Sequence, residues 1–72
     1  MIRVPVVSSH LSAVGYDPTT QTLEVAFKKG GVYQYLSVPS SVHASLMTAP
    51  SVGRYFDVYI KRAGYIARKI SL

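Results

Sequence analysis

The chain has 72 residues, no cysteine and a formal net charge of +5, from eight Lys and Arg against three Asp and Glu. A chain of this length folds as one domain with a small core, which argues against a deep, enclosed active site. The absence of cysteine excludes disulfides and thiolate metal sites. The basic balance favours anionic partners such as nucleic acid, although it also lies in the range that keeps small domains soluble.

Membrane and export signals are not evident in the sequence. The apolar segments are short and are interrupted by Ser, Gly, Pro or charged residues, so no transmembrane helix is expected. The first residues, Met1 to Pro5, lack the charged segment and apolar run of a secretory signal. We therefore expect a cytoplasmic protein that does not associate with membranes.

The N-terminal part of the chain favours β-strands. The valines around Pro5 are compatible with a short edge strand, where proline is tolerated. A second strand is expected from His10 to Tyr16, and the segment 17–21 predicts a turn because Asp and Pro favour turn conformations. The segment 22–28 shows the clearest alternation of apolar and polar residues, which is typical of a half-buried antiparallel strand.

The segment Lys28–Gly31 predicts a hairpin turn, and its length decides which side chains of the next strand are buried. A two-residue turn would leave Tyr33 and Tyr35 on the open face and bury Gln34. A three-residue loop with a left-handed glycine would bury both tyrosines and expose Gln34. Burying an unpaired amide costs about 1–3 kcal/mol, whereas a buried tyrosine can keep its hydroxyl at the rim. We therefore favour the three-residue loop.

Two helices are expected in the second half of the chain. The first is predicted for residues 40–49 and ends at Pro50. Ser51 is a natural N-cap for the second, which should extend from about Val52 to Arg62. Its apolar stripe, predicted to be buried in the core at helical spacing, consists of Val52, Tyr55, Phe56, Tyr59 and Ile60.

The C-terminal segment adds one further short element. Gly64 suits a helix C-terminus, and the alternation from Tyr65 to Ile70 favours a last strand. Residues 1–72 are thus expected to form a single α+β domain. We predict a small antiparallel meander of three or four strands, with two helices packed on one face.

The order of these residues resembles the KTSC domain, a module named for the C-terminus of some lysyl-tRNA synthetases and also found alone in small bacterial and phage proteins. The resemblance extends from about Ser9 onward. The motifs that carry it are Val14-Gly15-Tyr16-Asp17, Leu23-x-Val25-x-Phe27, Gly30, Tyr33-x-Tyr35, Val38-Pro39, Ala49-x-Ser51-x-Gly53-x-Tyr55-Phe56 and Ile60. Two positions depart from the pattern: Pro50 interrupts it, and Asp57 stands where an Asn is expected. The resemblance implies RNA binding, from the synthetase context, and no established activity.

Neither a catalytic set nor a metal site is expected. Asp17, Glu24 and Asp57 lie on separate predicted elements, and His10 and His43 are far apart without metal-binding spacing. His43 is expected on the solvent side of its helix. The protein is therefore expected to bind a partner without catalysis and without a cofactor.

Basic residues interleaved with tyrosines give the strongest functional signal. Aromatic rings can stack on bases while Lys and Arg hold phosphates. The two lysines of the predicted hairpin tip are expected to be exposed. The candidate nucleic-acid- or nucleotide-binding residues are Lys28, Lys29, Tyr33, Tyr35, Arg54, Lys61, Arg62, Arg68 and Lys69.

Three functions are compatible with this pattern. We favour a small basic module that binds nucleic acid, RNA rather than DNA. The first alternative is a protein that binds or sequesters a nucleotide or another small ligand, as a phage-encoded protein could, with a pocket completed in a homo-oligomer. The second is a protein–protein adaptor. Salt dependence separates these hypotheses, because nucleic-acid binding releases counterions and weakens steeply as salt rises.

Overall fold

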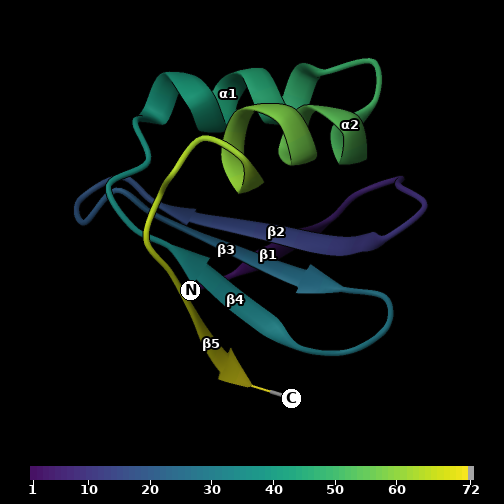
Figure 1. Cartoon of the computed structure of the whole chain (residues 1–72), viewed down its shortest axis with the longest axis horizontal. Helices are drawn as coiled ribbons and strands as arrows, with labels where there is room; N and C mark the ends of the chain where they lie inside the picture. Colours follow the sequence, from purple (N-terminus) through teal and green to yellow (C-terminus); the bar gives the residue numbers. More distant parts are fainter. Residues whose placement is uncertain (72) are drawn as a thin grey trace.

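The computed structural model describes residues 1–71, which form a five-stranded antiparallel sheet with two helices on one face (Figure 1). The strands lie in chain order across the sheet. Their bounds are β1 (Arg3–Pro5), β2 (Leu11–Asp17), β3 (Thr22–Phe27), β4 (Val32–Tyr35) and β5 (Ala67–Ser71). The helices α1 (Ser40–Thr48) and α2 (Val52–Phe56) lie in the connection between β4 and β5.

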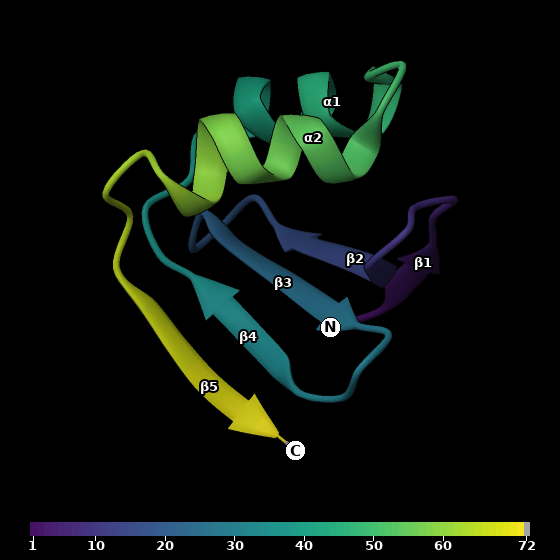
Figure 2. The same ribbon diagram turned by 45° about the vertical axis from the view of Figure 1, so that its right-hand side comes forward.

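The predicted α+β architecture is confirmed, with more strands than expected. Figure 2 shows both helices over the same face of the sheet, with β5 at one edge beside β4. The meander has five strands instead of three or four because both short terminal segments pair with their neighbours, β1 with β2 and β5 with β4. No helix within residues 1–71 has the length and apolar character needed to cross a membrane.

The β3–β4 hairpin adopts the predicted register. Tyr33 lies opposite Val25, and Tyr35 lies opposite Leu23. A three-residue loop connects the strands, closed by the Phe27 N–H, which donates to the Gly31 carbonyl at 3.1 Å. Gly30, the last residue of the loop, and Gly31, in the closing pair, have φ of 105° and 89°, values that residues with a side chain rarely adopt. Both tyrosines therefore face the helices.

Gln34 lies on the open face of the sheet, but the prediction that it is exposed is wrong. It is half-buried because its amide donates to Glu24 at 3.0 Å and its oxygen accepts from Arg68 at 2.9 Å. The Glu24 carboxylate also accepts from Arg3 at 2.9 Å. These side chains face one another across the strands, and Gly15 lies between Arg3 and Glu24 in that row. A polar ladder thus crosses the open face.

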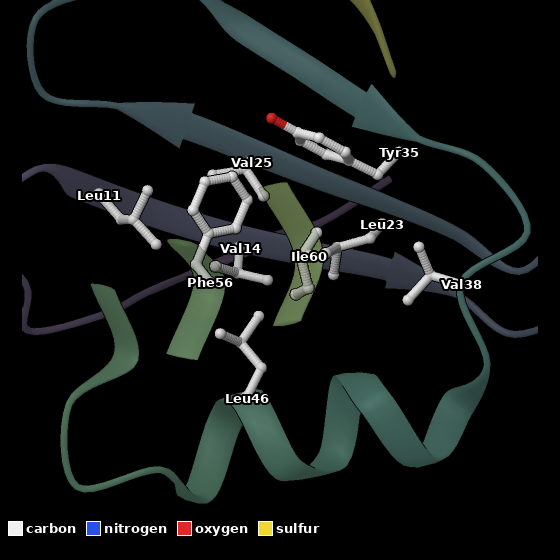
Figure 3. Close-up of a cluster of buried hydrophobic side chains, with 9 residues drawn as sticks. All are labelled: Leu11, Val14, Leu23, Val25, Tyr35, Val38, Leu46, Phe56 and Ile60. Atoms are coloured by element: carbon white, nitrogen blue, oxygen red, sulfur yellow. The ribbon is translucent and has the colours of Figure 1, made fainter. Parts of the chain in front are cut away.

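The hydrophobic core fills the space between the helices and the sheet (Figure 3). Phe56 is fully buried at its centre, with ring centroids 5.4 Å from Tyr35 and 5.6 Å from Phe27 in edge-to-face arrangements. The buried cluster consists of Leu11, Val14, Leu23, Val25, Tyr35, Val38, Leu46, Phe56 and Ile60. The predicted packing of the second helix on the apolar face of β3 is confirmed for the centre of its stripe.

The second helix changes its hydrogen-bonding pattern half-way. α2 continues into a π-helical turn, η1 (Asp57–Lys61), in which the Arg62 N–H donates to the Asp57 carbonyl at 3.2 Å. A π turn contains more residues than an α turn, so its side chains are rotated relative to an α-helical stripe. Ile60 stays buried, but Tyr59 is 57% exposed. The predicted core position of Tyr59 is therefore wrong.

Candidate nucleic-acid interface

A cleft of about 520 Å³ lies between the tip of the β3–β4 hairpin and the end of η1. Its lining consists of His10, Phe27, Lys29, Gly30, Tyr33, Tyr35 and Lys61, and we call it the basic cleft. The aromatic rings are buried or half-buried, whereas both lysines are exposed. The cleft therefore combines an apolar, aromatic interior with a cationic rim.

Five of the nine predicted site residues come together here, and a sixth, Lys28, adjoins Lys29 in the hairpin loop. Four of them line the basic cleft: Lys29, Tyr33, Tyr35 and Lys61. Lys28 is exposed beside Lys29 on the hairpin loop. Lys69 reaches over from β5, with its Nζ 6.0 Å from the centroid of the Tyr33 ring. Residues from the hairpin, η1 and β5 thus place three positive charges, those of Lys29, Lys61 and Lys69, around a few aromatic rings.

The three predicted arginines lie elsewhere. Arg54 lines a separate groove of about 470 Å³ beside the α1–α2 connection, together with residues such as Pro50 and Tyr59. Arg68 lies on the open face of the sheet, where it donates to Gln34. Arg62 is exposed at the end of η1 and lines neither hollow. None of these three arginines lines the basic cleft.

The aromatic residues of the cleft are held by the register of the hairpin. Tyr33 and Phe27 lie on neighbouring strands, with ring centroids 5.6 Å apart and planes at 83°. Tyr35 is 7% exposed. Its pKa is raised, first by burial and then by the charges of Tyr33 and Asp57. The Tyr35 hydroxyl therefore keeps its proton at neutral pH and remains a hydrogen-bond donor.

His10 lines the cleft although no motif or spacing indicated it as a site residue. The Ser8 hydroxyl accepts from the backbone N–H groups of His10 and Leu11, at 3.3 and 3.2 Å, which fixes the turn before β2. The imidazole packs on α2 at Gly53, where a Cβ atom would lie 2.6 Å from the ring. Its Nε2 is buried without a hydrogen bond and lies 3.4 Å from Asp57 Oδ1. Gly53 is thus required for the position of His10.

Phe27 is the other lining side chain that was absent from the predicted site, and Gly30 contributes only backbone. The hairpin register offered a signal for it, because a residue just before the loop must lie beside Tyr33. No such signal exists for His10, because it reaches the cleft through the pairing of β2 with β3. There its carbonyl accepts a hydrogen bond from the Lys28 N–H at 2.9 Å. Sequence spacing between distant segments does not reveal such a contact.

The chemistry available in the cleft is that of binding. Aromatic rings provide flat apolar surface for a planar ligand, and the lysines provide charge for an anionic group. A cleft of this volume is in the range of small-ligand sites, about 300–1,000 Å³. Among residues 1–71, no three His, Asp or Glu side chains are grouped so as to hold a metal ion.

Known proteins are similar to this chain in both sequence and fold. The profile of the KTSC domain family matches residues 7–65. The chain belongs to the KTSC domain family. The crystal structure of a KTSC domain protein from Yersinia pestis superimposes with a TM-score of 0.90 at 45% identity, covering 96% of both chains. An uncharacterized protein of Stutzerimonas stutzeri is 45% identical over 65 residues, which is 90% of this chain and 92% of that protein.

The domain also occurs within much longer proteins. A lysine–tRNA ligase of a Nostoc species is 47% identical over 53 residues, which is 74% of this chain but only 9% of the ligase. The KTSC similarity therefore concerns a small part of the ligase.

Proposed function

We propose that this KTSC domain binds single-stranded nucleic acid, RNA in preference to DNA, through the basic cleft. The observation that carries the proposal is the convergence of Lys29, Lys61 and Lys69 around an aromatic interior, with Lys28 next to Lys29 on the exposed hairpin loop. In this arrangement an unpaired base enters the cleft and stacks on an aromatic ring, while the lysines contact the flanking phosphates. The domain acts as a binding module in the cytoplasm and not as an enzyme.

The occurrence of a similar domain in lysine–tRNA ligases supports RNA over DNA as the partner. The size of the cleft supports a second candidate, a free nucleotide, because a single nucleotide matches a site of this volume. A mononucleotide would lack the additional phosphate contacts at Lys28 and Lys69. We therefore expect a single-stranded oligonucleotide to bind more tightly than a mononucleotide, and competition between the two measures the difference.

Salt dependence tests the proposal. If about three phosphates are neutralised, the logarithm of the association constant should fall with log salt at a slope near −2, because each single-strand phosphate contact contributes about −0.7. Fluorescence anisotropy with a labelled single-stranded RNA hexamer, at several salt concentrations, measures this slope. Binding that is indifferent to salt would contradict the proposal.

A matched pair of double variants locates the contacts. Replacing Lys29 and Lys61 with Ala removes both cations that line the cleft. The salt dependence should therefore become weaker, with a slope of about −0.7 instead of −2. Replacing Arg54 and Arg62 with Ala removes the same charge outside the cleft, and the slope should stay near −2. Equal losses in both variants would show that net charge, and not the cleft, determines binding.

A further inference from the structure

The groove beside the α1–α2 connection is a second hollow, and it shares no residue with the basic cleft. Its apolar lining includes Pro50, Tyr55, Val58 and Tyr59, and we call it the tyrosine groove. Val58 is 45% exposed and Tyr59 is 57% exposed. Neighbouring apolar side chains that remain in contact with water are typical of interaction surfaces. The tyrosine groove is therefore a candidate for a second binding surface.

The π turn is what places Tyr59 in this groove. A regular α-helical stripe would direct Tyr59 toward the core together with Phe56 and Ile60, whereas η1 leaves it exposed. π turns are rare, and they frequently occur at functional sites. Here the Tyr59 ring lies against Tyr55, with centroids 4.6 Å apart and planes at 35°. The irregular turn thus produces a continuous aromatic surface along the groove.

The polar groups of the groove indicate the chemistry of its ligand. The hydroxyls of Tyr55 and Tyr59 and the guanidinium of Arg54 can all donate hydrogen bonds. The Ser51 hydroxyl already accepts from the Arg54 N–H at 3.3 Å as the N-cap of α2. Within residues 1–71, Arg54 is the one charged residue of the lining, and its guanidinium makes no hydrogen bond or ion pair. The groove therefore suits a ligand with hydrogen-bond acceptors and a negative charge.

A proline-rich segment in the polyproline II conformation supplies such acceptors. Its backbone makes no internal hydrogen bonds, so its carbonyls are free to accept them. Proline also has no N–H that would be left unpaired against an apolar surface. Grooves lined by aromatic residues bind such segments, because the stiff helix loses little entropy on binding. A nucleic acid fits this groove less well, since Arg54 can contact only one phosphate, whereas three lysines surround the basic cleft.

We infer that the tyrosine groove binds a proline-rich segment of a partner protein that also carries an acidic residue. The prolines pack on the rings of Tyr55 and Tyr59, whose hydroxyls donate to the carbonyls of the segment. The carboxylate of the acidic residue pairs with the Arg54 guanidinium. This inference does not depend on the proposed nucleic-acid function, because the two surfaces have no residue in common. One domain can therefore bind a nucleic acid and a partner protein at the same time.

The test uses a fluorescein-labelled peptide in which pairs of prolines alternate with single glutamates, followed by fluorescence anisotropy at physiological salt. A matched peptide with lysine in place of glutamate should bind about fivefold more weakly, because it loses the ion pair with Arg54. A second peptide, with glycine in place of proline, keeps the negative charge but should bind at least about tenfold more weakly. Equal binding of the proline and glycine peptides, or no binding of the proline–glutamate peptide, would overturn the inference.

Two matched pairs of variants locate the bound peptide. Tyr59→Ala removes one of the two rings and should weaken binding about tenfold. Ile66→Ala shortens a side chain that is 71% exposed outside the groove, and it should leave binding unchanged. Arg54→Ala should reduce the preference for glutamate over lysine below about twofold, whereas Arg62→Ala, which removes the same charge outside both hollows, should retain it. Equal effects within either pair would overturn the inference.

Competition with RNA distinguishes the two surfaces. An unlabelled single-stranded RNA hexamer, added at physiological salt, should leave the labelled peptide bound, because it occupies the basic cleft and not the tyrosine groove. Displacement of the peptide by the hexamer would overturn the inference and assign the groove to nucleic acid.

Discussion

At the scale of single residues, the environment of His43 shows what the local pattern missed. The predicted solvent-facing position is wrong: His43 is half-buried, and its ring stacks on Tyr16 with centroids 4.5 Å apart and planes at 8°. Tyr16 is itself fixed, because its hydroxyl donates to the Val38 carbonyl. Burial lowers the pKa of His43 from its usual 6.5. The folded state therefore prefers the neutral imidazole.

This preference predicts a stability that depends on pH. Below about pH 6.5, His43 binds a proton more readily in the unfolded chain than in the folded chain. The contribution of neutral His43 to the free energy of unfolding is therefore complete above this pH and decreases as the pH falls through it. The melting temperature should drop between about pH 7 and pH 5. The melting temperature of the His43→Gln variant should drop less over the same interval. Thermal unfolding followed by circular dichroism in buffers of equal ionic strength measures both. The same pH dependence in both proteins would contradict this account of His43.

At the scale of elements, the strand patterns were predictable and the second helix was only partly so. The hairpin register can be predicted from two observations, the alternation in β3 and the difference in free energy between burying an amide and burying a tyrosine. The predicted helical stripe assumed 3.6 residues per turn throughout, and the π turn violates that assumption after Phe56. No residue in the stripe indicated the change, so Tyr59 was assigned to the core.

Phe56 is buried and Tyr59 is exposed, so alanine variants of the two residues should differ in stability. Phe56→Ala should reduce the free energy of unfolding by about 3–5 kcal/mol, because it empties the centre of the core. In a domain of this size that loss approaches the total stability. Tyr59→Ala should cost less than about 1 kcal/mol, since the ring is mostly exposed and its aromatic neighbour is Tyr55, at 4.6 Å between centroids. Urea denaturation measures both, and similar losses would contradict the π-helical geometry.

At the scale of the whole molecule, the fold was more predictable than the site. Local patterns determine which segments are strands and helices, and the order of strands follows the chain. The basic cleft joins His10, the β3–β4 hairpin and Lys61, which are distant in sequence, and only the packed structure selects these residues from all the basic and aromatic ones. The same packing directs Arg68 to the opposite face of the sheet, where the polar ladder holds it.

The location of the bound strand is the most direct test of the central claim. Backbone amide chemical shifts of the isotope-labelled protein, followed while a single-stranded RNA hexamer is added at low salt, report which residues contact it. The account predicts the largest changes around the cleft, at His10, at the loop from Lys28 to Gly31 and at Lys61. The residues of the open face around Gln34 and Arg68 should change little. Changes centred on that face, or on the groove beside Arg54, would contradict it.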